Sequence, residues 1–319
     1  MEDAYIVNGG TKLSGTVTLS GAKNLALKTI IASLLFDSIV TLTNVPKIND
    51  VEELLHLLEK LGAGVKREGG TLVIDPRTVK QNKPDLLHAS RLRASFLLFA
   101  PLLQKFHECY IPNPGGCRIG QRPIDRIVGG MEAFGAVVEY DSGNGDYHAK
   151  LSTSPQGTYT FNKPTHTGTE LLIMLGVLGD KQVIIENAAL EPEIDELISF
   201  LQEAGAKIEK NKTSIKIQSV PALKQVKPFK IFGDRNEAVT FAVLAVATKG
   251  SVEIRDLSSE HLTTFNEKMR EAGVKVEVEH DAVRYSYTGS IKPVSIETRP
   301  HPGFMTDWQP NWAVLMTQA

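Results

Sequence analysis

The six residues Leu58-Glu59-Lys60-Leu61-Gly62-Ala63 form a motif that recurs in similar form three more times along this 319-residue chain. The other copies are MEAFGA at 131–136, LQEAGA at 201–206 and MREAGV at 269–274. Their glycines are 73, 70 and 68 residues apart. A nearly constant period of this size indicates one structural unit repeated in tandem. After the fourth copy the sequence begins a fifth unit, and we expect that it stops inside it.

Each repeat unit has the same order of predicted elements. In the first unit, an apolar helix over 23–35 precedes a strand over 39–42 that contains β-branched residues. An amphipathic helix over 51–61 follows and ends at a glycine, and the alternating segment 71–74 closes the unit. A strand, a crossover helix and a second strand favour a sheet with parallel pairs. The periodicity leaves open whether the helices or the sheets form the interior.

The later units carry matching segments. The first helices of units two to four are predicted over 94–104, 170–177 and 238–247. Further strands are predicted over 182–185, 214–217 and 251–254. A stretch rich in Lys and Pro at 224–230 is a candidate domain boundary, and the length suggests about two domains.

Composition excludes several classes of protein. A net charge of −2 provides no broad basic surface for nucleic acid. The longest apolar run, 96–103, is too short to span a bilayer and contains Pro101. The N-terminal residues, MEDA at 1–4, are acidic and have no signal-peptide pattern. Two cysteines are too few for a disulfide framework. We therefore expect a cytoplasmic protein without membrane or nucleic-acid partners.

The loop at 114–123, PGGCRIGQRP, is the most specific segment for chemistry. Its glycines and prolines indicate a shaped loop, and Cys117 is followed by Arg118 and Arg122. Nearby cations lower the pKa of a thiol and increase its thiolate fraction. Cys117 is therefore a candidate reactive group, whereas Cys109 lies in a strand-like run and is interpreted as structural.

Polar residues recur at the start of each unit's first helix. Backbone N–H groups and the helix dipole make such a start suitable for an anion. If the repeats pack side by side, these starts converge on a cleft, which would be lined by Lys23, Arg93, Arg122, Arg235 and Asp307. Asp307, an acid among cations, is a candidate base. We expect no metal or cofactor, because no His, Cys, Asp and Glu group has ligand spacing.

These motifs carry a family resemblance. The sequence SGAKN at 20–24, the loop at 114–123 and Thr306-Asp307 resemble the UDP-N-acetylglucosamine 1-carboxyvinyltransferases, which catalyse the first committed step of bacterial peptidoglycan synthesis. Residues 186–194 and 300–302 resemble the same family, and the likeness covers the whole chain.

The resemblance implies an inside-out α/β barrel in two domains built from units of about 70 residues. One domain would run over 22–228, and the other would combine 1–21 with 229–319. Three units in each domain would total about 420 residues, so the resemblance predicts that about 100 residues of the second domain are missing.

The resemblance also implies an activity and its residues. The enolpyruvyl group of phosphoenolpyruvate would move to the 3′-hydroxyl of UDP-N-acetylglucosamine by addition and elimination, with release of phosphate. Cys117 would protonate the vinyl carbon and be alkylated by fosfomycin, and Asp307 would take the hydroxyl proton. Lys23 and Asn24 would also be catalytic, and together with Arg122 they would bind phosphoenolpyruvate. The loop would close as a lid. The residues implied for UDP-N-acetylglucosamine are Arg93, Arg122, Pro123, Ile124, Asp125, Lys163, Pro164, Thr165, His166, Thr167 and Asp307.

Two other hypotheses are a shikimate-pathway enolpyruvyl transferase and a non-catalytic paralogue or inactive fragment that binds nucleotide sugar. The cysteine loop argues against the first. The second is favoured by the segment 165–169, THTGT where the family usually has a sequence of the SVGAT type, and by the missing units. The retention of both Cys117 and Asp307 argues against it. The oligomeric state is left open by the sequence.

Overall fold

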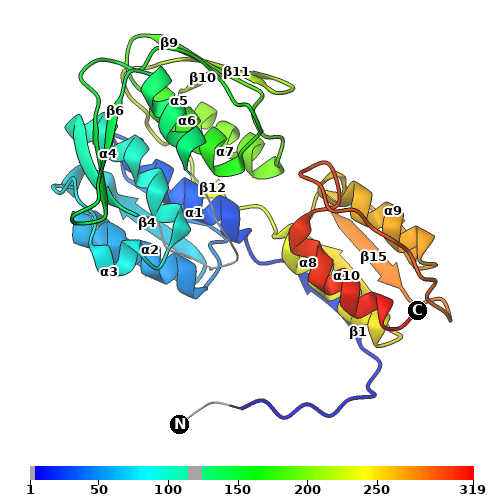
Figure 1. Ribbon diagram of the computed structural model, residues 1–319. Coiled ribbons are helices and arrows are strands. Elements are labelled where there is room, and N and C mark those ends of the chain that lie inside the picture. The colour runs from blue at the N-terminus through cyan, green and yellow to red at the C-terminus, as the bar shows by residue number, and fades with distance from the viewer. Residues whose placement is uncertain (1–3, 114–123) are drawn as a thin grey trace. The chain divides into compact units, whose positions relative to one another are not determined.

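The computed structural model describes residues 4–113 and 124–319. The chain divides into two compact units, which are described separately below (Figure 1). Unit 1 joins the N-terminal residues up to Ala22 with Phe232–Ala319, and unit 2 is Lys23–Ile231.

The first repeat shows how each unit of sequence folds. The strands β2 (Val40–Thr43), β3 (Gly64–Glu68) and β4 (Thr71–Asp75) form one sheet in the order β2-β4-β3, with both neighbours antiparallel to β4. The strands β2 and β3 therefore run in the same direction, and helix α2 (Asn49–Leu61) connects them as the predicted crossover. The expected parallel neighbours are separated by β4, because the tight β3–β4 hairpin inserts the last strand between them.

The other repeats have the same sheet order. These sheets are β5-β7-β6, β9-β11-β10 and β13-β15-β14. Their strands are β5 (Glu108–Pro112), β6 (Val137–Asp141), β7 (Asp146–Lys150), β9 (Gln182–Glu186), β10 (Lys207–Asn211), β11 (Ser214–Gln218), β13 (Ser251–Arg255), β14 (Lys275–Val278) and β15 (Ala282–Ser286). The crossover helices are α5 (Asp125–Ala133), α7 (Pro192–Glu203) and α9 (Thr263–Glu271).

Parallel neighbours do occur at the outer edge of three sheets. There a strand from elsewhere in the chain pairs with the first strand of the repeat. These outer strands are β12 (Phe229–Lys230) beside β2, β8 (Gly157–Thr160) beside β9, and β1 (Ser14–Thr18) beside β13.

The repeated glycines have one structural reason. Gly62, Gly135, Gly205 and Gly273 follow the four crossover helices, and their φ angles are 100°, 97°, 105° and 87°. Side chains with a Cβ rarely adopt this left-handed conformation, which ends a helix. The repeated sequence motif therefore corresponds to the end of each crossover helix and the turn into the next strand.

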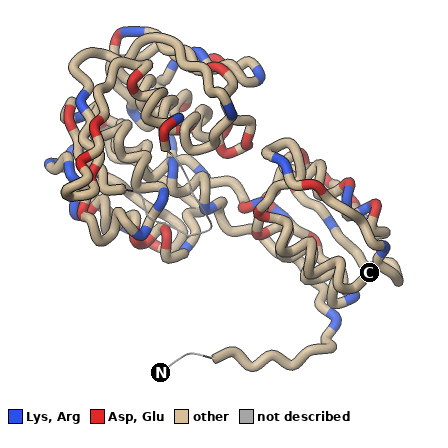
Figure 2. Tube along the Cα trace, viewed as in Figure 1, with Lys and Arg blue, Asp and Glu red and all other residues tan. Residues whose placement is uncertain are grey.

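The core of unit 2 consists of helices with sheets around them. The helices α1 (Lys23–Ala32) and α6 (His166–Gly176) are apolar on almost every side and largely buried, and α4 (Phe99–Phe106) is buried over 99–103. A helix that is hydrophobic all round requires neighbours all round. The strands lie outside the helices in Figure 1, and the charged residues follow the outer parts of the trace in Figure 2. The fold is thus the inside-out arrangement of helices and sheets.

Short helices complete unit 2. They are η1 (Ser33–Leu35), η2 (Pro76–Thr78), α3 (Leu86–Ala89) and η3 (Arg93–Leu98). The single helix predicted over 94–104 was wrong in part, because η3 is a 3-10 segment and α4 begins only at Phe99. Pro101 cannot donate the helical hydrogen bond to residue 97, which limits how early the α-helix can begin.

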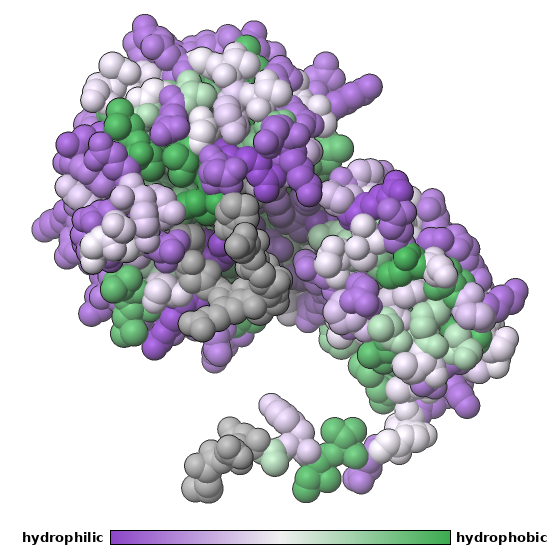
Figure 3. Space-filling view, in the orientation of Figure 1, coloured by the Kyte–Doolittle hydropathy of each residue, from purple (hydrophilic) through white to green (hydrophobic). Residues whose placement is uncertain are grey.

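Unit 1 packs α8 (Arg235–Ala247), α9 and α10 (Gln309–Met316) around an aromatic core that includes Phe265, Trp308 and Trp312. Its short helices are η4 (Ser259–Leu262) and η5 (Thr306–Trp308). Apolar side chains also reach the surface here (Figure 3). Leu244 of α8 and Val314 of α10 are 44% and 55% exposed. Within residues 4–113 and 124–319, none of the helices combines the length and the hydrophobicity that crossing a bilayer requires.

Candidate functional site

The three core helices of unit 2 begin at the same end. The segment η3 packs against α1 and α6, and its continuation α4 packs against η1 at the end of α1. Gln104, near the end of α4, donates from Nε2 to the carbonyl of Leu178, just beyond α6, at 3.1 Å. The helices therefore run in the same direction, and Lys23, Arg93 and His166 lie at their starts.

Lys23 and Asn24 are the first two residues of α1. The Nζ of Lys23 lies 3.3 Å from Oδ2 of Asp50, in the first turn of α2, and both side chains are almost half exposed. An exposed pair of this kind contributes little to stability. A phosphate or carboxylate could therefore replace Asp50 as the partner of Lys23 at small cost. Asp50 was not among the predicted site residues.

The described residues of the two segments implied for the nucleotide lie together in unit 2. Ile124 and Asp125 open α5, and Arg126 donates from Nη1 to the carbonyl of Lys163 at 3.1 Å. Tyr159 also lies beside this start: burial raises the pKa of its phenol, and the nearby Asp125 carboxylate raises it further. Lys163 and Pro164 are exposed and lead directly into α6.

Thr165 caps the start of α6. Its Oγ1 accepts a hydrogen bond from the backbone N–H of Gly168 at 3.4 Å, as a helix N-cap does. A Cβ at Gly168 would come within 2.5 Å of Cγ2 of Thr165, so this turn requires a glycine. The unusual THTGT sequence thus still forms a regular, capped helix start with His166 and Thr167 half-buried in the first turn.

A buried group of charged side chains lies just behind these helix starts. Glu170 of α6 has a fully buried side chain, and its Oε2 lies 3.4 Å from Nζ of Lys28 on α1. Its Oε1 lies 3.0 Å from Nε2 of His166. Lys28 and Glu170 were not among the predicted site residues. The available signal was one acidic and one basic residue, each inside an otherwise apolar helix.

In unit 1, Asp307 is exposed in η5, and the next residue anchors that segment. The indole Nε1 of Trp308 donates to Oδ1 of Asn236 at 2.8 Å, and the guanidinium of Arg235 lies 6.0 Å from the indole ring centroid. Trp308 also makes edge contacts with Phe265 and Phe304.

Arg235 is placed differently from the expectation that it lines a cleft. It is only 1% exposed, and its Nη1 lies 3.3 Å from Nδ1 of His301. In unit 1 it therefore supports the segment that carries Asp307.

Replacing Trp308 by Ala is expected to destabilise unit 1 by about 3–5 kcal/mol, because it removes a buried indole and leaves a cavity. The side chain is 1% exposed, so nearly all of its surface contributes to the packing that the substitution removes. Chemical denaturation of the Trp308→Ala and Trp308→Phe proteins measures the effect. Phe should recover part of the loss because it refills most of the cavity, and equal stability of the Ala variant and the unmodified protein would contradict the account.

Cys109 is structural, as predicted. It lies in β5 with no exposed surface, and burial raises the pKa of its thiol strongly, with a smaller contribution from Glu108. A neutral, inaccessible thiol reacts slowly. We expect a thiol reagent to label Cys109 only after denaturation, which mass spectrometry of digested protein can measure. Rapid labelling of Cys109 in the folded protein would contradict this assignment.

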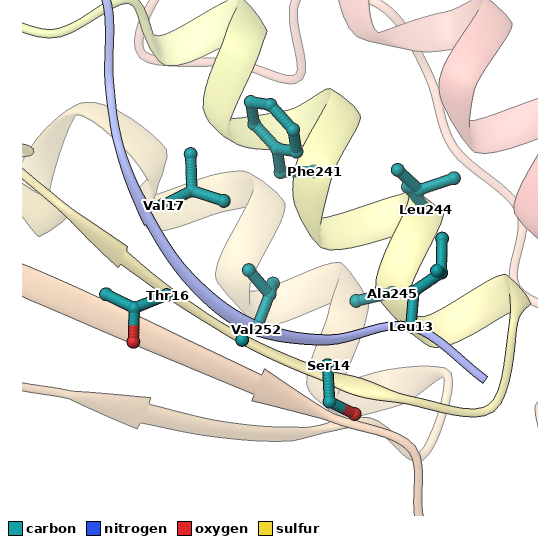
Figure 4. Close-up of a pocket in the computed structure, with 9 residues that line it drawn as sticks. Leu13, Ser14, Thr16, Val17, Phe241, Leu244, Ala245 and Val252 are labelled. Atoms are coloured by element: carbon teal, nitrogen blue, oxygen red, sulfur yellow. The ribbon is translucent and has the colours of Figure 1, made fainter.

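Cys117, Arg122 and Pro123 lie outside the residues that the structure describes. Elsewhere in the chain, no group of three or more His, Cys, Asp and Glu side chains is arranged to hold a metal ion. A groove of about 230 Å³ in unit 1 lies between β1 and α8, lined by Leu13, Val17, Phe241 and other residues (Figure 4). Its lining contains no charged side chain, so it offers none of the groups that the predicted chemistry needs.

Comparison with known proteins identifies the family. The family model for EPSP synthase (3-phosphoshikimate 1-carboxyvinyltransferase) matches residues 7–319. A UDP-N-acetylglucosamine 1-carboxyvinyltransferase from Desulfosudis oleivorans is 39% identical over 99% of this chain and 76% of its own length. The chain belongs to the UDP-N-acetylglucosamine 1-carboxyvinyltransferases of the EPSP synthase family.

Other relatives agree with that membership. The UDP-N-acetylglucosamine 1-carboxyvinyltransferase 2 of Streptococcus thermophilus is 37% identical over 98% of this chain and 75% of its own length. Among solved structures, the enolpyruvyl transferase NikO from Streptomyces tendae has a TM-score of 0.86 at 19% identity, covering 98% of this chain and 74% of its own. An EPSP synthase from Acinetobacter baumannii has a TM-score of 0.71 at 15% identity, covering 91% of this chain and 68% of its own. These two likenesses establish the enolpyruvyl transferase fold, as predicted.

Proposed function

We propose that this protein transfers the enolpyruvyl group of phosphoenolpyruvate to the 3′-hydroxyl of UDP-N-acetylglucosamine and releases phosphate. The observation that carries the proposal is 39% identity over 99% of the chain to a relative named for this reaction. The reaction would be the first committed step of peptidoglycan synthesis, in the cytoplasm. The two compact units would be the two enolpyruvate transferase domains.

The start of α1 would bind phosphoenolpyruvate. The unpaired N–H groups of a helix start and the positive end of its dipole favour phosphate. Lys23 adds a full charge and Asn24 a directional donor at this position, with Arg122 as a third partner. The weak, half-exposed pair between Lys23 and Asp50 would open as phosphate binds.

The starts of η3, α5 and α6 would bind the nucleotide sugar. Arg93 provides a cation at the first of these starts. Arg122 to Asp125 and Lys163 to Thr167 would contact the nucleotide, and the Arg126–Lys163 hydrogen bond joins the first turn of α5 to the segment before α6. Asp307 would approach the reacting hydroxyl.

The chemistry requires one proton donor and one proton acceptor. The 3′-hydroxyl oxygen attacks C2 of phosphoenolpyruvate while Asp307 accepts the hydroxyl proton and Cys117 donates a proton to C3. This forms a tetrahedral adduct that still carries phosphate. Removal of a proton from C3 then expels phosphate and restores the vinyl group on the new ether. The loop at 114–123 would exclude water from the adduct.

The acceptor distinguishes this function from its alternative in the same superfamily. Phosphoenolpyruvate is supplied with either UDP-N-acetylglucosamine or shikimate 3-phosphate, and the products are identified by mass spectrometry. We expect an enolpyruvyl ether only of the nucleotide sugar. An ether only of shikimate 3-phosphate would reassign the substrate, and tight nucleotide-sugar binding without any product would support a non-catalytic paralogue.

A further inference from the structure

Lys28, Glu170 and His166 form a buried charged network between two core helices of unit 2. The side chains of Lys28 and Glu170 are 8% and 0% exposed, whereas that of His166 is 23% exposed. Neither carboxylate oxygen of Glu170 has a hydrogen-bond partner, although both lie within ion-pair distance of a basic nitrogen. The buried carboxylate therefore depends on Lys28 and His166 for electrostatic stabilisation.

Such a network is a costly way to fill a helical core. Removing two charges from water costs several kcal/mol per ion, and apolar side chains of similar volume often stabilise as well or better. All other side chains from Leu25 to Ala32 on α1 are apolar or, like Thr29, hydrogen-bonded within the helix. The charges therefore suggest a role beyond packing.

The network places one ring nitrogen of an imidazole against a buried carboxylate at a helix start. His166 is the first residue of α6, and its Nε2 atom is buried against Oε1 of Glu170 at 3.0 Å. A histidine held by a carboxylate at one ring nitrogen has its orientation set and presents the other nitrogen to a second partner. Nε2 is inaccessible and the side chain is 23% exposed, so Nδ1 is the ring nitrogen left to contact a ligand.

Lys28 has a separate electrostatic effect. A carboxylate four residues from the start of α6 would repel an anion bound there, at a separation where charges in a partly buried site interact strongly. The Nζ of Lys28 lies 3.4 Å from Oε2 of Glu170 and compensates that charge. Glu170 can thus orient His166 without making the helix start unfavourable for an anion.

We propose that Lys28 and Glu170 are positioning residues that hold His166 so that its Nδ1 contacts a phosphate oxygen of the nucleotide sugar's diphosphate. The inference rests on the proposed function, in which the start of α6 lies at the nucleotide sugar. The diphosphate is the anionic part of that ligand, and it suits a donor combined with the free N–H groups of a helix start.

The test compares UDP with uridine, which lacks the phosphates, by calorimetric binding to the 319-residue protein and its variants. His166→Ala and Glu170→Gln are each expected to weaken UDP binding about tenfold or more, the effect of losing a hydrogen bond to a charged group, with uridine affinity unchanged. The double variant Lys28→Met/Glu170→Leu should keep the thermal stability of the unmodified protein and still bind UDP weakly. The matched control removes another ion pair of unit 2, Lys210 with Asp195, through Lys210→Met/Asp195→Asn; we expect no change in either affinity.

Several results would overturn the inference. Normal UDP affinity in the His166→Ala protein would exclude the phosphate contact, and equal losses for UDP and uridine would point to a disordered site. Full UDP affinity in the double variant would reduce Lys28 and Glu170 to packing residues. These outcomes leave the proposed function intact, because the unmodified protein still binds UDP and forms product. If the unmodified protein binds no UDP and makes product only with shikimate 3-phosphate, the proposed function itself fails and the inference fails with it.

Discussion

Replacing Asp307 by Asn is expected to lower kcat by about 10²–10⁴-fold, the usual contribution of a positioned general base. The amide has nearly the same shape but cannot accept the proton of the attacking hydroxyl. Because Asp307 is exposed and the fold of its segment depends on the buried Trp308, the substitution should leave the melting temperature almost unchanged. Steady-state phosphate release at saturating substrates measures the effect.

The matched control for Asp307 is Asp281→Asn. Asp281 is also an exposed aspartate of unit 1, and it has no role in the proposed reaction. This variant should turn over like the unmodified protein. Unchanged kcat in Asp307→Asn would remove the residue from the base role, and a large rise in KM with normal kcat would assign it to substrate binding alone.

Replacing Cys117 by Ser is expected to lower kcat by about 10²-fold or more, because a hydroxyl is a much weaker acid than a thiol toward the vinyl carbon. Cys117→Asp should retain turnover, since a carboxyl group can donate the proton, but it should no longer be alkylated by fosfomycin. Turnover assays and the protein's mass after incubation with fosfomycin measure the two effects.

Cys109→Ala provides the control for the second cysteine. The Cys109 thiol is buried in β5 and has a raised pKa, so its loss should change neither turnover nor alkylation. Full activity in Cys117→Ser would exclude the proton-donor role. Loss of activity in Cys117→Asp would show that the reaction needs the thiol rather than any acid at that position.

Local patterns in the sequence predicted the repeat and its elements because their causes are local. The glycine that ends each crossover helix has to adopt a left-handed conformation, as at Gly62. A glycine therefore recurs in the sequence about every 70 residues. Alternation predicted β4 over 71–74 and β11 over 214–217, close to the observed bounds.

The order of strands could not be read in the same way. A crossover pattern favours parallel neighbours, but the β3–β4 hairpin places an antiparallel strand between β2 and β3. Whether helices or sheets form the interior is likewise a consequence of how several repeats pack together. The resemblance supplied that answer, and the buried core helices of unit 2 agree with it.

The residues of the candidate site show the same difference between local features and contacts of distant segments. Helix starts have sequence signals, so Lys23, Arg93 and His166 could be identified, and the structure places these residues at one end of unit 2. Pairings between distant segments have no such signal. The Lys28–Glu170 contact and the burial of Arg235 beside Trp308 follow from how the helices pack, which the sequence alone does not show.

The most direct test of the proposed function is phosphate release from phosphoenolpyruvate by the 319-residue protein, measured with and without UDP-N-acetylglucosamine. We expect phosphate to appear only when the nucleotide sugar is present, in equal amount to the enolpyruvyl ether formed. Release that is independent of the nucleotide sugar, or no release when both substrates are present at saturating concentration, would contradict the assignment of this chain as a working enolpyruvyl transferase.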